Sequence, residues 1–168
     1  MGMQTSETLD RDIPLSERLA AAIRTGNYEG IEQVSAYAAC ISPLLKALGW
    51  RAYQRELLEA LPHFAFELDL IDLRNLLVTL GYESDERYTS IRHISEDLLP
   101  CLYVGEQGEV LVVIEREGDQ ISYFDANKRE YLTRKVDSKR GHVYLFTDMH
   151  PTHAVPTEEQ ISEEWFSR

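Results

Sequence analysis

The spacing of apolar positions changes about halfway along the chain. In the first half they recur every three or four residues, which is the spacing of one face of an α-helix. The clearest of these segments begins at Asp69, a residue suited to an N-cap, and ends at Gly81. Its apolar stripe consists of Leu70, Leu73, Leu76, Leu77 and Leu80.

Earlier helices are predicted over residues 16–26, 36–48 and 53–61. Gly49 ends the second of them, and Pro62 ends the third. A glycine followed by an aromatic residue closes both the 36–48 segment and the leucine stripe. Glycine adopts the left-handed conformation of a helix C-terminus without strain, so these endings are structural signals.

The second half has short segments rich in β-branched and aromatic residues, separated by turn residues. Residues 109–115 are nearly continuously apolar between acidic ends, as expected of a central strand covered on both faces. Helices followed by an antiparallel meander predict an α+β fold, in which an N-terminal helical half packs on an antiparallel β-sheet. The predicted strands span 99–104, 110–115, 121–124, 130–133 and 142–146.

Composition narrows the classes of partner. The 168 residues suffice for one domain with a core. The net charge of −12 repels phosphate backbones, so no nucleic-acid partner is expected. The chain has no apolar run long enough to insert into a membrane. Its two cysteines, Cys40 and Cys101, favour reduced thiols over a disulfide framework.

Few sequence patterns suggest a cofactor or metal site. No G-x-x-x-x-G-K-[ST] loop occurs, which excludes a nucleotide site of that type. His150 and His153 have a spacing that shares a metal on a helix, but Pro151 lies between them. We therefore expect neither a metal nor a cofactor.

Cysteine–histidine catalysis requires a thiolate, an imidazole and a group that orients the imidazole. Cys40 is the candidate thiol and Asp125 the candidate orienting acid. The histidine is the difficulty, because none of His63, His93 and His142 stands at the head of the central strand. A single cysteine near a helix is more often a small core residue, and we expect Cys40 to be buried.

Six blocks of sequence carry a family resemblance, namely CISPLLKALGW, LPHFAFELDLIDLRNLLVTLGY, LLPCLYV, GEVLVVIE, ISYFDAN and HVYLF. In order and spacing they resemble the cytosolic N-terminal domain of ABC transporters of bacterial type I secretion systems. That domain is related to the papain-like peptidases that remove double-glycine leaders from bacteriocins. The similarity covers roughly residues 31–146, and the closing EEWF resembles the start of the linker to the first membrane helix.

The resemblance implies a papain-like fold and a division of the chain. Residues 1–14 would be a disordered N-terminal tail, and residues 15–147 the peptidase-like domain. Residues 148–168 would be a C-terminal linker toward the transporter membrane domain.

The family's nucleophile and oxyanion positions differ here. In active members a glycine closes the helix thirteen residues after the nucleophile. Counting back from Gly49 gives Ala36, so Cys40 falls one turn beyond the nucleophile position. The glutamine of the oxyanion hole precedes the nucleophile by six residues, which gives Gly30 here, whereas Gln33 is three residues away.

The two remaining catalytic positions lie in the second half. The family's histidine opens the central strand, where this chain has Val110. The orienting acid has a counterpart in Asp125. The resemblance therefore implies a vestigial site, at Ala36, Val110 and Asp125, in a domain that is not an enzyme, although the whole transporter would be an ATPase.

The function that the resemblance implies is non-catalytic recognition of the exported protein, a calcium-binding repeat protein or an adhesin. The site would face the cytosol at the bacterial inner membrane. Its other partner would be the rest of its own transporter, with membrane and nucleotide-binding domains, dimeric when complete. Candidate substrate contacts, for which core packing is an equal alternative, are Tyr37, Tyr103, Tyr123 and Phe124.

Two alternatives remain open at this point. One is an active cysteine peptidase that uses Cys40, with His93 or His142 recruited as the base, to process a leader peptide. The other is a purely structural module that sets transporter assembly and binds no substrate.

Overall fold

The computed structural model describes residues 17–18, 21–22, 25, 34–50, 54–62 and 67–149. The predicted tail over residues 1–14 and the linker from residue 150 onward lie outside the described residues. So do three of the histidines and two of the oxyanion-hole candidates, namely His63, His150, His153, Gly30 and Gln33.

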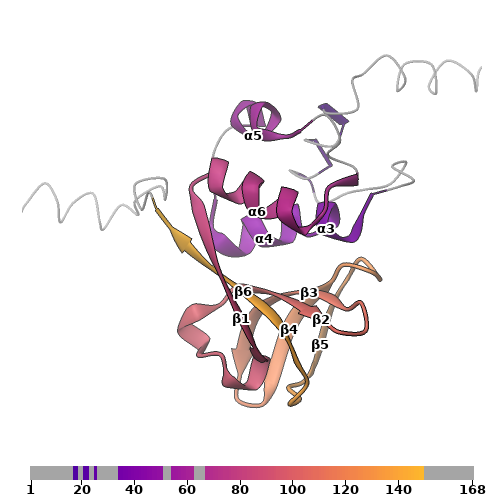
Figure 1. Ribbon diagram of the computed structural model, residues 1–168. Helices are drawn as coiled ribbons and strands as arrows, with labels where there is room; N and C mark the ends of the chain where they lie inside the picture. The colour runs from indigo at the N-terminus through magenta and orange to yellow at the C-terminus, as the bar shows by residue number, and fades with distance from the viewer. Residues whose placement is uncertain are drawn as a thin grey trace, which may run out of the picture.

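Helices lie on one side of a β-sheet (Figure 1). Figure 1 places α3, α4 and α6 next to the sheet, with α5 farther away beyond α6. In the described part of the chain, no helix combines the length and apolar character that a membrane crossing requires. The helices are α3 (Ala36–Ala39), α4 (Ile41–Leu48), α5 (Gln54–Ala60) and α6 (Leu70–Thr79).

The ends of α6 and α4 follow the sequence signals. Asp69 caps α6 through a reciprocal pair of hydrogen bonds with Asp72. Gly49 ends α4 in the left-handed conformation, with φ of 77°.

The predicted helix over residues 36–48 is divided at Cys40 into α3 and α4. The N–H of Cys40 is shared between the carbonyls of Ala36, at 3.2 Å, and Tyr37, at 3.1 Å. Pro43 has no N–H to donate to the carbonyl of Ala39, so regular helical bonding is interrupted here.

The sheet has six strands in the order β1-β6-β2-β3-β4-β5, and all neighbours are antiparallel. The predicted meander holds from β2 to β5. The last strand departs from it, because β6 pairs with β2 and β1 and not with β5. The strands are β1 (Tyr82–Ser90), β2 (Cys101–Gly105), β3 (Val110–Glu117), β4 (Gln120–Asp125), β5 (Glu130–Lys135) and β6 (Arg140–Asp148).

Strand β1 was not predicted from the sequence. It reads YESDERYTS and pairs with β6 from Tyr82 opposite Asp148 to Ser90 opposite Arg140. As an edge strand it is exposed along most of its length, so it lacks the apolar alternation on which the prediction relied.

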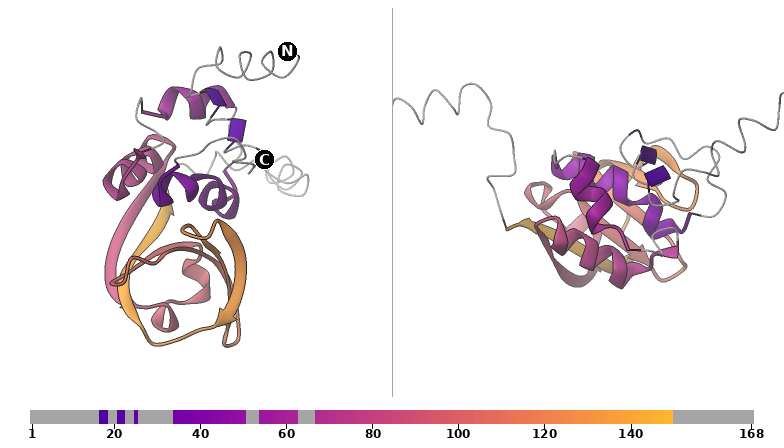
Figure 2. Two further views of the ribbon diagram at one scale, coloured as in Figure 1. Left: turned by 90° about the vertical axis from the view of Figure 1, so that its right-hand side faces the viewer. Right: turned by 90° about the horizontal axis from the view of Figure 1, so that it is seen from above.

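Both faces of the sheet are covered. One core joins the helices to the sheet and includes Leu44, Leu73 and Val112. The other includes Leu111 and Val113, and it lies on the opposite face. Figure 2 (left) shows the sheet curling around this second side, which also receives the short 3₁₀ segments η2 (Ile91–His93) and η3 (Glu96–Leu98). Strand β3 is therefore central and covered on both faces, as its apolar run predicted.

Candidate functional site

The first half of the candidate site is the start of α3. Ser35 is the N-cap, and its Oγ accepts a hydrogen bond of 3.1 Å from the N–H of Ala38. The same hydroxyl donates to the carbonyl of Leu68 at 2.7 Å, so it also ties α3 to the segment before α6. These bonds fix Ala36, at the inferred nucleophile position, as the first residue of the helix.

The second half is formed by the start of β3 and the end of β4. Val110 opens β3 and is 4% exposed. Asp125 ends β4 opposite Leu111, and the N–H of Ala126 donates to the carbonyl of Val110 at 2.9 Å. The structure thus places Val110 beside the turn that follows Asp125.

The carboxylate of Asp125 shapes the turn that follows it. Its Oδ1 accepts hydrogen bonds from the N–H groups of Asn127, at 3.0 Å, and Lys128, at 3.1 Å. The Asn127 amide in turn donates to the carbonyl of Gly108 at 2.9 Å. Asp125 therefore has a structural role, because its side chain forms an Asx turn with the residues that follow it.

Arg129 joins the two halves. Its φ of 56° lies in the left-handed region, and its N–H bonds to the carbonyl of Asp125 at 2.6 Å. Its guanidinium donates to the carbonyl of Val34 at 2.6 Å, directly before the N-cap of α3. No local sequence pattern predicts this contact, because the two residues are 95 positions apart.

Cys40 is completely buried in the core between the helices and the sheet. Burial raises the pKa of its thiol far above the ordinary value of 9.0, and the nearby Asp125 carboxylate raises that pKa further. At neutral pH the thiol is therefore protonated. The expectation of a buried Cys40 is confirmed.

The two histidines among the described residues form their hydrogen bonds with residues outside the candidate site. His93 Nδ1 lies 2.8 Å from Ser90 Oγ, and His142 Nδ1 lies 2.7 Å from Glu86 Oε1. Neither histidine forms a hydrogen bond with Cys40. In the part of the chain that the structure describes, no group of three or more His, Cys, Asp or Glu residues is arranged to hold a metal ion.

Two of the four candidate substrate contacts lie on the helix side of the sheet. Tyr37, on α3, is half-buried against the first core, and Phe124, on β4, is 4% exposed within it. Burial raises the pKa of Tyr37, with smaller contributions from Cys40 and Asp69. A further aromatic residue, Tyr131 on β5, has its ring centroid 5.1 Å from that of Phe124 and is 59% exposed. Cross-strand pairing with β4 identifies Tyr131, which sequence reasoning had missed.

The other two candidates lie on the opposite face. Tyr103 and Tyr123 belong to the second core, and the Tyr103 hydroxyl donates to the carbonyl of Lys139 at 3.2 Å. The Arg134 guanidinium stacks 5.0 Å above the Tyr123 ring. Successive side chains of a strand point to opposite faces, so Tyr123 and its neighbour Phe124 cannot share one cleft.

Comparison with known proteins shows a similarity to a solved structure. No protein-family model matches the chain, and no curated protein matches it. The chain is similar to the crystal structure of the N-terminal peptidase C39-like domain of the toxin secretion ATP-binding protein from Vibrio parahaemolyticus. That similarity covers 70% of this chain and 98% of the other, with 17% sequence identity and a TM-score of 0.49.

Proposed function

We propose that this chain is a non-catalytic docking domain of a type I secretion ABC transporter. It engages the exported protein on the cytosolic side of the bacterial inner membrane. The observation that carries the proposal is the position of Val110, which lies beside the turn after Asp125. The sequence resemblance assigns the catalytic histidine to this position.

The chemistry of the site supports a role without catalysis. Ala36 has a methyl group where a nucleophile would stand, and Val110 can neither accept nor donate a proton. The remaining thiol of Cys40 is buried and protonated at neutral pH. Asp125 already accepts two main-chain hydrogen bonds from its own turn.

The proposed ligand is an extended segment of a calcium-binding repeat protein or an adhesin. Tyr131 offers an exposed ring beside Phe124, and Tyr37 lies across the same core. Aromatic rings provide apolar contact area together with a polar edge. Tyr103 and Tyr123 do not contribute to this surface, because they lie on the opposite face.

The other proposed partners are the membrane and nucleotide-binding domains of the same transporter. In this account residues 15–147 form the docking domain, and residues 148–168 lead toward the membrane domain. The domain's position at the cytoplasmic face then lets it meet the exported protein before translocation.

An NMR titration tests the proposal. The ¹⁵N-labelled chain is titrated with the C-terminal region of a calcium-binding repeat protein that is exported by the same bacterium. We expect amide shifts to change around Ala36 and from Ala126 to Arg129. Tyr131→Ser should weaken binding, whereas Leu98→Ser, which replaces a 41% exposed residue on η3, should not. Shift changes that avoid both segments would contradict the proposed site.

A further inference from the structure

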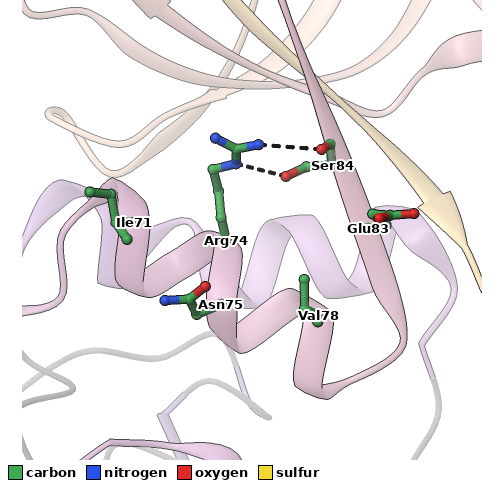
Figure 3. Close-up of a pocket in the computed structure, with 6 residues that line it drawn as sticks. All are labelled: Ile71, Arg74, Asn75, Val78, Glu83 and Ser84. Atoms are coloured by element: carbon green, nitrogen blue, oxygen red, sulfur yellow. Dashed lines mark hydrogen bonds between the residues drawn. The ribbon is translucent and has the colours of Figure 1, made fainter.

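A groove lies between α6 and the edge strand β1, away from the site described above (Figure 3). Its volume is about 250 Å³. It is open to solvent, and the two elements that form it are joined by the tight turn at Gly81. The groove is lined by Ile71, Arg74, Asn75, Val78, Glu83 and Ser84.

The helix contributes an exposed apolar stripe. Ile71 and Val78 are 67% and 47% exposed, and their spacing of seven residues places them on one face of α6. Both side chains line the groove, so they offer exposed apolar contact area to a ligand that lies in it.

Arg74 forms the floor between these two residues. Its Nε donates to Ser84 Oγ at 2.8 Å, and its guanidinium lies 5.0 Å from the centre of the Tyr144 ring. Figure 3 shows the side chain reaching from the helix to the strand. These contacts brace α6 against β1 and keep the groove in shape.

The ladder between β1 and β6 shows which main-chain groups face outward. The N–H of Met149 bonds to the carbonyl of Gly81, and that pair continues the register of β1 with β6. Antiparallel pairs alternate between bonded and non-bonded. The N–H and C=O groups of Ser84, Glu86 and Tyr88 therefore point away from β6.

Two arginines cover part of this outer edge. Arg74 donates to the carbonyl of Ser84 at 3.3 Å, and Arg140 donates to the carbonyl of Tyr88 at 3.4 Å. The N–H groups of Ser84, Glu86 and Tyr88, together with the Glu86 carbonyl, have no main-chain partner in the part of the chain that the structure describes. The free edge is thus rich in donors.

The face of β1 opposite to the Ser84 side chain is acidic. Glu83 and Asp85 are exposed, and they alternate along the strand with Ser84. Asp85 pairs with exposed Arg87 at 3.4 Å, whereas the Glu83 carboxylate has no hydrogen bond or ion pair among the described residues. With a net charge of −12, the chain also attracts cations over long range.

We propose that the outer edge of β1 binds an extended polypeptide segment as an additional strand, in which apolar side chains alternate with lysine or arginine. Side chains of an added strand point alternately to the two faces. One set would pack on Ile71 and Val78, and the other would lie beside Glu83 and Asp85. This site is separate from the candidate site formed by the start of α3 and the turn after Asp125 (the α3 site), and it does not depend on the proposed function.

The test uses the 168-residue chain and a nine-residue peptide in which valine alternates with lysine. We expect NMR shift changes at the amides of Ser84, Glu86 and Tyr88, and affinity that falls as salt rises. A peptide of the same composition with the valines and lysines in two blocks should bind at least about fivefold more weakly, because it loses one face of the contact. A valine–glutamate peptide should not bind.

Single substitutions identify the surface that binds the peptide. Ile71→Ser and Val78→Ser should each weaken binding of the valine–lysine peptide about fivefold, with unchanged melting temperature because both side chains are exposed. Tyr131→Ser should bind this peptide normally, which separates the groove from the α3 site. Equal binding of the alternating and block peptides, or no binding at all, would overturn the proposal. If the β1 amides shift when the chain alone is concentrated, a second copy is the occupant and the peptide proposal is wrong.

Discussion

The guanidinium of Arg129 donates a hydrogen bond of 2.6 Å to the main-chain carbonyl of Val34. Through this bond the turn after β4 is fastened to the residue before the N-cap of α3. The two halves of the candidate site are therefore joined by a side-chain-to-main-chain hydrogen bond.

Replacing Arg129 should destabilise the domain. Arg129→Ala removes a charged donor from a part-buried carbonyl, which should lower the free energy of unfolding by about 1–3 kcal/mol. Arg129→Gly should cost less than Arg129→Ala, because glycine tolerates the φ of 56°. Urea unfolding measures both, with Lys128→Ala as the matched control. Equal stability of Arg129→Ala and wild type would show that the bond does not hold the site together.

Any side chain at Gly141 is expected to lower the stability of the domain. A Cβ at this position would lie 2.7 Å from the Val104 carbonyl oxygen and 2.9 Å from the Tyr103 ring. Gly141→Ala should therefore cost about 1–3 kcal/mol or more. At Gly105 the nearest atoms would be 3.2 Å away, so Gly105→Ala should cost less. Thermal unfolding of both variants tests this order, and the reverse order would contradict the packing of Tyr103.

Stability should fall at alkaline pH because of the buried thiols. Burial raises the pKa of Cys101 from 9.0 to about 12, and that of Cys40 is raised as well. Above pH 9.0 the unfolded chain loses thiol protons that the folded chain keeps, which favours unfolding. Each thiol should then lower the free energy of unfolding by up to about 1.4 kcal/mol per pH unit.

Urea unfolding at a series of pH values measures this slope. Because the Cys101→Ala variant lacks one of the two thiols, its stability should decline less steeply between pH 9.0 and about 12. The buried tyrosines contribute the same slope to both proteins. Parallel curves for wild type and variant would mean that the pKa of Cys101 is no higher in the folded chain than in the unfolded chain.

Binding of the exported protein at the α3 site should tolerate salt. The domain has a net charge of −12, so an acidic substrate is repelled at long range and must bind through short-range apolar and main-chain contacts. Affinity should be about micromolar or weaker, because ordering a flexible segment opposes binding. Calorimetry at low and high sodium chloride should give equal or slightly tighter binding at high salt. Affinity that collapses with salt would indicate a charge-driven site.

The sequence predicted those parts of the fold that have local signals. The cap at Asp69 and the left-handed Gly49 located helix ends, and the apolar run beginning at Val110 identified the central strand. Strand β1 has no such signal, because it is an exposed edge whose pairing with β6 depends on residues some 60 positions away.

The sequence predicted only part of the candidate site, for a related reason. Val110 and Asp125 are the ends of strands that pair directly, so their proximity follows from local order. Arg129 and Val34 meet only through the packing of helices on the sheet, which no short pattern encodes. Placing Tyr123 in one cleft with Phe124 neglected the alternation of strand side chains.

Mass spectrometry of a double-glycine-leader peptide measures whether the domain has peptidase activity. The peptide is incubated with the domain for a prolonged period, with an active leader peptidase as the positive control. We expect the peptide to stay intact, because Ala36 supplies no nucleophile and Val110 supplies no base. Specific cleavage after the two glycines, abolished by Cys40→Ala, would show that the domain is an active cysteine peptidase and would contradict the account.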